Sequence, residues 1–212
     1  QPVVLVLASG RGERFAASGG TVHKLRATLE GVPVLERTLA AVRDSGLPWH
    51  LEDAGHPGMG DSIAAAVRAT REAPGWLVLP GDLPLVEPQT LRAVADTLTM
   101  GAPAVVPVFE GRRGHPVGFG EACGPALAAL SGPQGAARLL RELAVYELPV
   151  DDIGCVTDID TMDDLGRLTA EEARDLEVQL RGGSLPLPVK LSEVTGCGLA
   201  AVPLRVAPLA VA

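Results

Sequence analysis

The sequence predicts an α/β fold built on a mostly parallel sheet, and three observations lead to this prediction. Two continuous apolar runs, Val3–Leu7 (VVLVL) and Trp76–Leu79 (WLVL), are typical of strands that are buried on both faces. Strand-like apolar segments alternate along the chain with segments of helical periodicity. The length of 212 residues suffices for one large domain with a substantial core.

The composition narrows the class of protein further. Hydrophobic residues make up 47% of the chain but aromatic residues only 3%, so we expect an aliphatic core of Val, Leu and Ala. The net charge of −8 and the lack of a basic block argue against a nucleic-acid surface. No apolar run is long enough to predict a membrane span. Cys123, Cys155 and Cys197 match no zinc spacing, and we expect buried, reduced thiols in a cytoplasmic protein.

The first half of the chain is expected to alternate between strands and helices. Pro33 suits the first turn of a helix that carries an apolar stripe, and Gly46 is placed to end it. The expected elements are a strand at Val3–Leu7, a glycine-rich loop from Ala8 to about Gly31, a helix from Pro33 to Gly46, a weak strand at Trp49–Leu51, a helix capped by Asp61 or Ser62 and ending near Arg71, the strand Trp76–Leu79, and a helix from Pro88 to about Leu98.

The second half continues the alternation with shorter elements. Thr161 and Asp164 have the spacing of a capping box, which predicts a helix to about Leu180. The elements before it are expected to be a strand at Ala104–Phe109, a turn at Glu110–Gly114, a return strand at His115–Phe119, short helices near Pro125–Leu130 and Gln134–Leu143, and strands at Val145–Pro149 and Gly154–Ile159. We expect one domain over residues 1–182. An apolar, proline-rich extension over 183–212 receives no predicted chemistry.

Glycines and cations follow the first strand. Gly10 and Gly12 could form an ordinary glycine turn, but Arg11, Arg14 and Lys24 lie in the same loop. Three cations around flexible backbone amides can neutralise a triphosphate, which favours a nucleotide-binding loop.

A lone carboxylate follows the strand that ends at Leu79. Asp82 could cap a turn, or it could bind magnesium, which takes one or two carboxylates together with phosphate oxygens and waters. Asp158 and Asp160 offer a second carboxylate near another predicted strand end, although either could instead cap the following helix.

A third group of polar residues lies in the turn after Phe109. His115, next to a proline, is more often structural in such a context. Its neighbours Arg112 and Arg113 nevertheless suit an anionic second substrate.

These motifs resemble a known family, the MobA-like nucleotidyltransferases, and within it the molybdenum cofactor cytidylyltransferases. The resemblance spans about residues 3–170 and rests on several motifs in the same order. They are Leu7–Phe15 (LASGRGERF) with Lys24, Gly58–Ile63 (GMGDSI), Pro80–Val86 (PGDLPLV), Gly111–Val117 (GRRGHPV), Gly135–Leu140 (GAARLL) and Asp158–Thr161 (DIDT).

The resemblance implies a Rossmann-like, three-layer nucleotidyltransferase domain that uses Mg²⁺ and a nucleoside triphosphate. It implies metal binding by Asp82 with Asp158 or Asp160, and catalytic roles for Asp82, Lys24 and Arg14. From the residue types and the expected topology, we place acceptor binding near Arg112, Arg113 and His115. The nucleotide-binding residues that the resemblance implies are Ala8, Ser9, Gly10, Arg11, Gly12, Arg14, Lys24 and Ser62.

The leading hypothesis is transfer of CMP from CTP to a phosphate-bearing pterin, with apo-molybdoenzymes as further partners that the resemblance suggests. Use of GTP is an alternative, although the guanylyl branch more often has two glycines where this chain has Ser9 and Gly10. A nicotinamide-dependent oxidoreductase is disfavoured because Phe15 replaces the third glycine of a dinucleotide fingerprint. A non-catalytic nucleotide-binding module is disfavoured by the presence of Lys24 and Asp82.

Overall fold

The computed structural model describes residues 1–10 and 12–168, apart from the side chain of Arg14. The chain divides into two units, Gln1–Glu171 and Glu172–Ala212. Arg11, the predicted end of the last helix and the predicted extension over 183–212 therefore lie outside the described residues. No helix in the described part combines the length and the apolar character that crossing a membrane requires.

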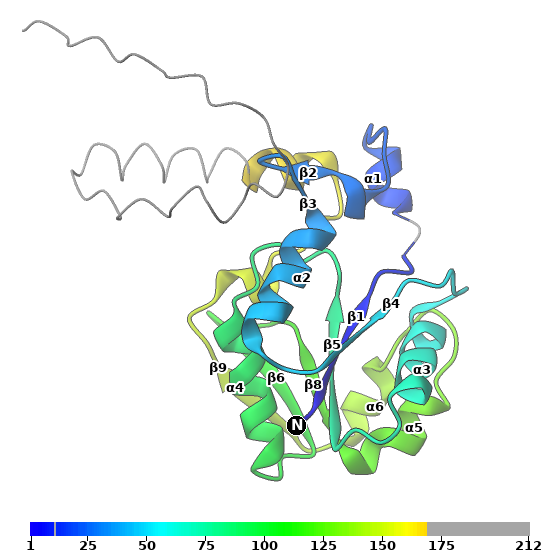
Figure 1. Cartoon of the computed structure of the whole chain (residues 1–212), viewed down its shortest axis with the longest axis vertical. Coiled ribbons are helices and arrows are strands. Elements are labelled where there is room, and N and C mark those ends of the chain that lie inside the picture. Colours follow the sequence, from blue (N-terminus) through cyan, green and yellow to red (C-terminus); the bar gives the residue numbers. More distant parts are fainter. Residues whose placement is uncertain (11, 169–212) are drawn as a thin grey trace, which may run out of the picture. The chain divides into compact units, whose positions relative to one another are not determined.

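The described part is built around one sheet with the strand order β4-β1-β5-β8-β6-β7, in which β9 pairs with β6. Only β7 and β8 run antiparallel to their neighbours, so the prediction of a mostly parallel α/β sheet is confirmed (Figure 1). The strands are β1 (Val3–Leu7), β4 (Trp49–Glu52), β5 (Gly75–Pro80), β6 (Ala104–Phe109), β7 (Arg112–Arg113), β8 (Val117–Gly120) and β9 (Val145–Pro149).

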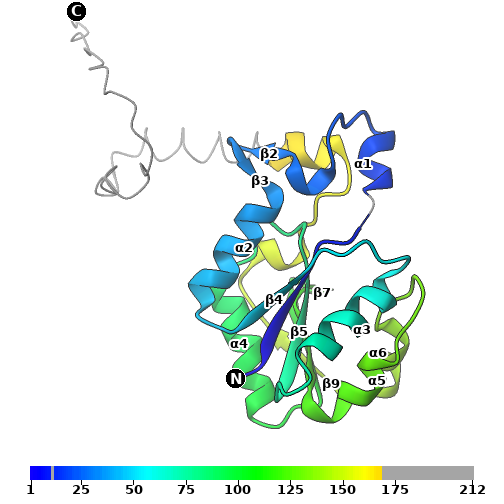
Figure 2. The same ribbon diagram turned by 45° about the vertical axis from the view of Figure 1, so that its right-hand side comes forward.

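Helices cover both faces of this sheet (Figure 2). One face carries α2 (Val34–Ser45) and α4 (Pro88–Thr99). The other carries α3 (Met59–Ala69), α5 (Gly124–Ala128) and α6 (Ala137–Glu142). Each face of the sheet is therefore covered by one layer of helices.

The two cores follow from the alternation of side chains along each strand. Val4 and Val6 pack with residues of α2 and α4, such as Leu39 and Leu91. Leu5 and Leu7 point to the other face and pack with a cluster that includes Ile63, Val67, Trp76 and Phe119. Strands β1 and β5 are thus buried on both faces, which is why their sequences are continuous apolar runs.

Local sequence signals predicted the ends of α2 but not the start of α3. Pro33 is the N-cap of α2 and Gly46 caps its carboxyl end, close to the prediction. The prediction that Asp61 or Ser62 caps α3 is wrong, because the helix begins at Met59 after Gly58. The Asp61 carboxylate instead accepts a hydrogen bond from the Gly132 backbone N–H at 3.0 Å. Asp61 therefore makes a contact with a distant loop instead of capping α3.

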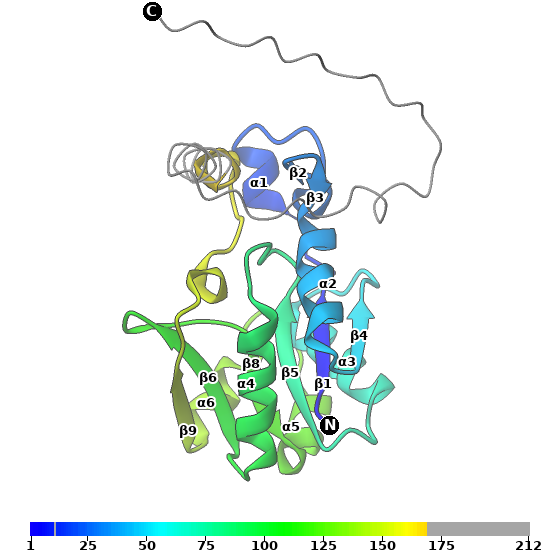
Figure 3. The same ribbon diagram turned by 60° about the vertical axis from the view of Figure 1, so that its left-hand side comes forward.

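The segment expected as a long loop after β1 contains regular structure. It holds α1 (Glu13–Ala17), the 3₁₀ helix η1 (Lys24–Arg26) and a hairpin of β2 (Thr28–Leu29) with β3 (Val32–Pro33). These elements lie beyond the carboxyl ends of β1 and β5 (Figure 3). Their own small core joins Phe15, Leu25, Leu29, Val34, Ile159 and Leu168. The glycine content of this segment concealed the few apolar residues that hold it together.

Two further predictions in the second half are corrected. The stretch Gly154–Ile159 is not a strand: residues Ile153–Val156 form the 3₁₀ helix η3, and no sheet pairing follows. The turn expected at Glu110–Gly114 contains the short strand β7. The capping box at Thr161 and Asp164 is present: Asp164 Oδ2 accepts from the Thr161 N–H at 2.8 Å, and Thr161 Oγ1 accepts from the Asp164 N–H at 3.2 Å. The helix that it starts is described over residues 162–168.

Candidate active site

The candidate site lies where β1 and β5 end. These two strands are parallel neighbours, so the segments that follow them meet at one edge of the sheet. The Gly81 N–H donates to the Leu7 carbonyl at 2.9 Å, which holds the two segments side by side. A cavity of about 410 Å³ opens there. Its lining includes Ser9, Gly10, Gly12, Lys24, His56, Met59, Ser62, Asp82 and Asp160.

Lys24 is the centre of an ionic cluster in this cavity. Its Nζ lies 2.5 Å from Asp82 Oδ2 and 3.1 Å from Asp160 Oδ1. Burial alone would lower the pKa of Lys24, but the charges and hydrogen bonds of the two carboxylates outweigh this effect and hold the pKa above its usual 10.5. The lysine is therefore an ammonium ion at physiological pH, although its side chain is only 14% exposed.

The partner carboxylate Asp160 reaches the cluster through a backbone anchor. The Ile159 N–H donates to the Asp82 carbonyl at 3.0 Å, and the Ile159 side chain is fully buried. This anchor places the segment around Ile159 against the end of β5. The structure therefore brings Asp160, rather than the exposed Asp158, to Asp82.

The donor set at this cluster suits a magnesium ion. Asp82 Oδ1 is buried and has no hydrogen-bond partner among the described residues, so it keeps an unused acceptor. No cluster of three or more His, Cys, Asp or Glu side chains that could hold a metal occurs within residues 1–10 and 12–168. Two carboxylates completed by phosphate oxygens and waters is a usual environment for Mg²⁺. Asp82 and Asp160 are thus the residues that would hold it.

The glycine-rich loop is held in place by His23, which sequence reasoning missed. The His23 Nε2 lies 2.6 Å from the Gly10 carbonyl, and His23 Nδ1 accepts from the Leu25 N–H at 3.3 Å. Gly12 has a φ of 64°, a left-handed conformation that favours glycine. Arg11 and the side chain of Arg14 lie outside the described residues, so their predicted roles stay predictions.

The opposite wall of the cavity comes from the start of α3. Ser62 lines the cavity and its Oγ donates to the Gly58 carbonyl at 3.3 Å. Met59 also lines it and is 48% exposed. Gly60 has no room for a side chain, because a Cβ there would lie 2.8 Å from the Ser131 carbonyl group. The predicted position of Ser62 near a base or sugar stays a prediction.

A second group that sequence reasoning missed lies beside this wall, around Glu52 at the end of β4. Its carboxylate accepts from His56 Nε2 at 3.0 Å and from the Ala54 N–H at 3.3 Å, and it faces His50 Nε2 at 3.5 Å. Burial acts to raise the pKa of Glu52, but these hydrogen bonds outweigh it and hold the pKa below its ordinary value of 4.5. Glu52 thus fixes His56 at the cavity. Glu52, His50 and His56 belong to no sequence motif, so sequence reasoning had no signal for this group.

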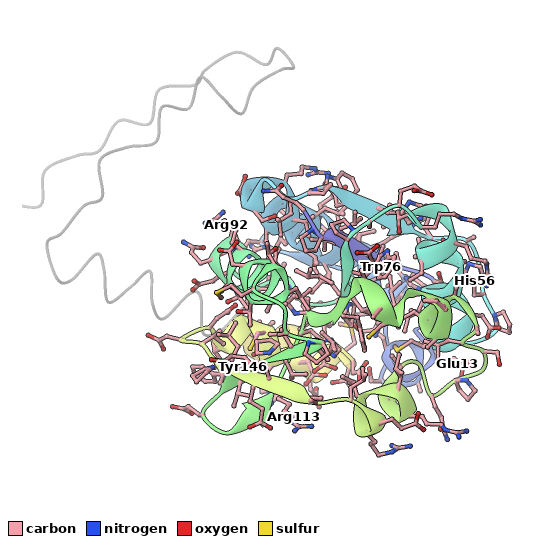
Figure 4. The ribbon with its side chains drawn as sticks, turned by 90° about the horizontal axis from the view of Figure 1, so that it is seen from below. Glu13, His56, Trp76, Arg92, Arg113 and Tyr146 are labelled. Atoms are coloured by element: carbon pink, nitrogen blue, oxygen red, sulfur yellow. The ribbon has the colours of Figure 1, made fainter. Side chains whose placement is uncertain are left out.

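The predicted acceptor residues do not all lie together. Arg113 Nη2 is 2.6 Å from Glu147 Oε1 on β9, and both side chains are largely exposed. Figure 4 shows Arg113 near Tyr146, on a different side of the molecule from Glu13 and His56. Arg112 instead donates to the Val156 carbonyl at 3.1 Å and lines a second, polar cavity of about 250 Å³. Thr157, Asp158, Asp164 and Arg167 are among its other lining residues.

His115 is a residue whose ring is influenced by the charges of both Asp82 and Asp158. Burial lowers the pKa of its ring, against the opposing influence of the Asp82 charge, the Val78 backbone and the Asp158 charge. Its Nδ1 is buried without a hydrogen-bond partner among the described residues. The ring is therefore neutral near pH 7, and its predicted contact with an acceptor stays a prediction.

Comparison with known proteins places this geometry in context. The family model described as MobA-like NTP transferase domain matches residues 40–147. The crystal structure of Rv0371c from Mycobacterium tuberculosis H37Rv superposes with a TM-score of 0.68 at 26% identity, over 80% of this chain and 97% of that one. The complex of Rv0371c with manganese gives a TM-score of 0.63 at 25% identity, over 80% and 98% of the two chains.

Two further similarities are more distant or more partial. Molybdopterin-guanine dinucleotide biosynthesis protein A from Archaeoglobus fulgidus superposes with a TM-score of 0.60 over 81% of this chain and 99% of that one. At 21% identity, this similarity concerns the fold alone. The bifunctional protein GlmU of Coxiella burnetii is 29% identical over 125 residues, which are 49% of this chain. The match covers 27% of GlmU, so the chain spans about a quarter of the length of this curated relative.

Proposed function

The chain belongs to the family of MobA-like NTP transferases, and from this premise we propose that it transfers CMP from CTP to the molybdopterin form of the molybdenum cofactor. The class of reaction, nucleotidyl transfer, is that of its family. The base and the acceptor are our proposal. They are supported by the signature around Ser9 and Gly10 and by the order of motifs along residues 3–170.

The observation that carries the proposal is the cluster of Lys24, Asp82 and Asp160 beside the glycine-rich loop. Nucleotidyl transfer requires reactants held in line and negative charge neutralised, and it requires little covalent chemistry from the protein. Backbone amides around Gly10 and Gly12 can bind phosphate oxygens, and the Lys24 ammonium can bind another. The cavity of about 410 Å³ is of the size usual for a small-molecule ligand.

The proposed reaction forms one bond and breaks one. A terminal phosphate oxygen of the acceptor attacks the α-phosphorus of CTP, and the bond from that phosphorus to the bridging oxygen breaks, releasing pyrophosphate. The attacking phosphate is already anionic and needs no base, and no base is assigned. Lys24 would stabilise the charge that develops around the α-phosphorus.

Magnesium is the proposed cofactor, held by Asp82 and Asp160. When bound, it would neutralise charge on the phosphate oxygens of the nucleotide. The manganese complex of Rv0371c supports use of a divalent cation by a similar protein. For this chain, support comes from Asp82 Oδ1, which has no hydrogen-bond partner within residues 1–10 and 12–168, and from the second carboxylate beside it.

A turnover assay tests the proposal. The full chain is incubated with Mg²⁺, molybdenum cofactor and one of CTP, GTP, ATP or UTP, and both pyrophosphate and dinucleotide product are measured. We expect product with CTP and little with the others. Product formed mainly with GTP would replace CTP by the alternative substrate. Absence of pyrophosphate with every nucleotide, while nucleotide still binds, would favour a non-catalytic module.

A further inference from the structure

The Lys24 ammonium lies between the two carboxylates that are proposed to hold the metal. It lies 2.5 Å from Asp82 Oδ2 and 3.1 Å from Asp160 Oδ1, so it already neutralises both side chains in part. A divalent cation bound by these two oxygens would stand next to an ammonium ion. Two cations at such a distance repel each other strongly in a partly buried cavity. Lys24 and a metal therefore cannot both make their best contacts here.

The position of the lysine stem suggests where the ammonium can go. A Cβ placed on Gly12 would lie 3.5 Å from Lys24 Cγ, so the stem runs beside the glycine-rich loop. A phosphate bound to the backbone amides of that loop would be within the sphere that the flexible four-carbon stem can sweep. Rotation within the side chain could then move the ammonium from the carboxylates to the phosphate, without movement of η1.

We propose that Lys24 is an internal counter-ion that competes with the metal for Asp82 and Asp160, and that a bound triphosphate withdraws it. This proposal rests on the proposed function only in naming the triphosphate as the ligand that draws Lys24 away. Metal binding is then weak in the nucleotide-free protein and becomes strong when nucleotide is bound. By thermodynamic reciprocity the metal also strengthens nucleotide binding.

The competing explanation is that Lys24 helps to hold the carboxylates in place for the metal. It predicts that removing the ammonium disorders the site and weakens metal binding. Competition predicts the opposite sign, because removal takes away the ammonium that lies between the two carboxylates. The sign of one equilibrium measurement separates the two explanations.

The experiment measures Mn²⁺ binding to the full chain without nucleotide, by electron paramagnetic resonance of free Mn²⁺. The variants are Lys24→Met and, as a matched control, Arg26→Met, which removes an exposed cation from the same 3₁₀ turn. We expect Lys24→Met to raise the Mn²⁺ affinity by about tenfold or more, a usual size for coupling between two sites. Arg26→Met should leave it within about twofold, because charge effects between exposed groups are screened.

Two further variants locate the effect. Lys24→Arg keeps the charge and should bind Mn²⁺ as weakly as the wild type. Asp82→Asn added to Lys24→Met should abolish the gain, since one of the competing carboxylates is lost. Thermal unfolding of each variant, followed by circular dichroism, confirms that it is folded.

Unchanged or weaker Mn²⁺ binding by folded Lys24→Met would overturn the proposal, and so would a gain that survives Asp82→Asn. The measurement contains no nucleotide and no acceptor. Failure of the turnover assay would therefore leave this result standing, and failure here would leave the turnover assay unaffected.

Discussion

At the scale of single residues, the site depends on a few charged side chains in a partly buried setting. Asp82 is 9% exposed and Lys24 lies beside it, so each charge is stabilised mainly by the other. Separating such a pair by mutation leaves an uncompensated charge, which is expensive in a cavity. Every substitution in this cluster therefore needs a measure of folding besides activity.

Asp82→Asn and Asp160→Asn should each reduce kcat by orders of magnitude, while Asp158→Asn should have a small effect. The physical reason is that charge neutralisation at a transferring phosphoryl group contributes several kcal/mol. Among the described residues, the ion pairs of Lys24 are those with Asp82 and Asp160, and none is with Asp158. Steady-state kinetics at saturating CTP and Mg²⁺ measure the difference. Near-normal turnover in folded Asp82→Asn would remove this residue from the metal site.

Lys24→Ala should lower kcat more than it raises the KM for CTP. The proposed contact with the α-phosphate strengthens as charge develops in the transition state, and such a contact affects kcat. Initial rates over a range of CTP concentrations, at fixed saturating Mg²⁺, separate the two constants. A rise in KM at normal kcat would make Lys24 a ground-state binding residue.

Glu52→Gln should destabilise the protein near neutral pH and reduce its sensitivity to acid. Hydrogen bonds to an ionised group contribute about 1.5–3 kcal/mol each at most, and the amide keeps part of them, so we expect a loss of about 1–3 kcal/mol. Because the folded-state pKa of Glu52 is depressed, its stabilisation is present above pH 4.5 and is lost as the pH falls through the folded-state pKa.

Urea unfolding at a series of pH values from 7 to 3.5 tests this prediction. The wild-type free energy of unfolding should fall more steeply below pH 4.5 than that of the variant. Parallel curves for the two proteins would show that Glu52 does not carry the acid sensitivity.

At the scale of elements, burial on both faces decided what could be predicted. Strands β1 and β6 begin and end where the apolar runs predict, because continuous apolar sequence is a local signal. Strand β9 also has its predicted bounds, although it is largely exposed. The 3₁₀ helix η3 was mistaken for a strand because its short sequence is mostly apolar, although within it only Gly154 and Cys155 are buried. Nothing in that local sequence reports that Ile159 pairs with the Asp82 backbone instead of a sheet neighbour.

The site residues, like the strands, were predictable only where a local sequence signal marks them. Lys24 and Asp82 follow strand ends and carry motif residues, so the sequence pointed to both. His23, Glu52 and His56 act through hydrogen bonds to groups that no periodicity indicates. The choice of Asp160 over Asp158 depends on a backbone anchor to β5, which a sequence alone does not show.

Gly60→Ala should destabilise the protein, while Gly166→Ala should not. A Cβ at Gly60 would lie 2.8 Å from the Ser131 carbonyl group, so α3 and the loop at Ser131–Gly132 would have to separate. Such overpacking typically costs about 1–3 kcal/mol. Gly166 has open space around it in a helix, where alanine is favoured over glycine by about 1 kcal/mol.

Thermal and urea unfolding of both variants measures this contrast. Equal stability of Gly60→Ala and wild type would mean that the start of α3 can shift at no cost. The close contact at Gly60 would then not be the reason for glycine in this motif.

At the scale of the whole molecule, an acidic chain is proposed to bind a polyanion. The net charge of −8 repels a triphosphate at long range, so binding has to depend on local cations and backbone amides. The two cavities lie on either side of the segment from Asp158 to Asp160, since Asp160 lines one and Asp158 the other. This arrangement suits a reaction that brings two phosphates together from separate subsites.

The last prediction assigns one substrate to each cavity. Arg112 lines the second cavity, whereas Arg113 is paired with Glu147 at the edge of the sheet. In the second cavity Asp164 is already bonded to Thr161 and Arg167, which leaves the Arg112 guanidinium as a cation for the acceptor's phosphate. Arg112→Ala should weaken acceptor binding by about tenfold, the loss of one charge-assisted contact, and leave CTP affinity unchanged.

Arg113→Ala is the matched control, and it should change acceptor binding by less than about twofold because exposed ion pairs contribute little. Separate equilibrium titrations of each variant with CTP and with the pterin acceptor measure both affinities. A larger loss of acceptor binding in Arg113→Ala would move the acceptor to the edge formed by β7 and β9. A loss of CTP affinity in Arg112→Ala as large as the loss for the acceptor would mean that both substrates share one cavity. The second cavity, which Asp158 lines, would then not be a separate subsite for the acceptor.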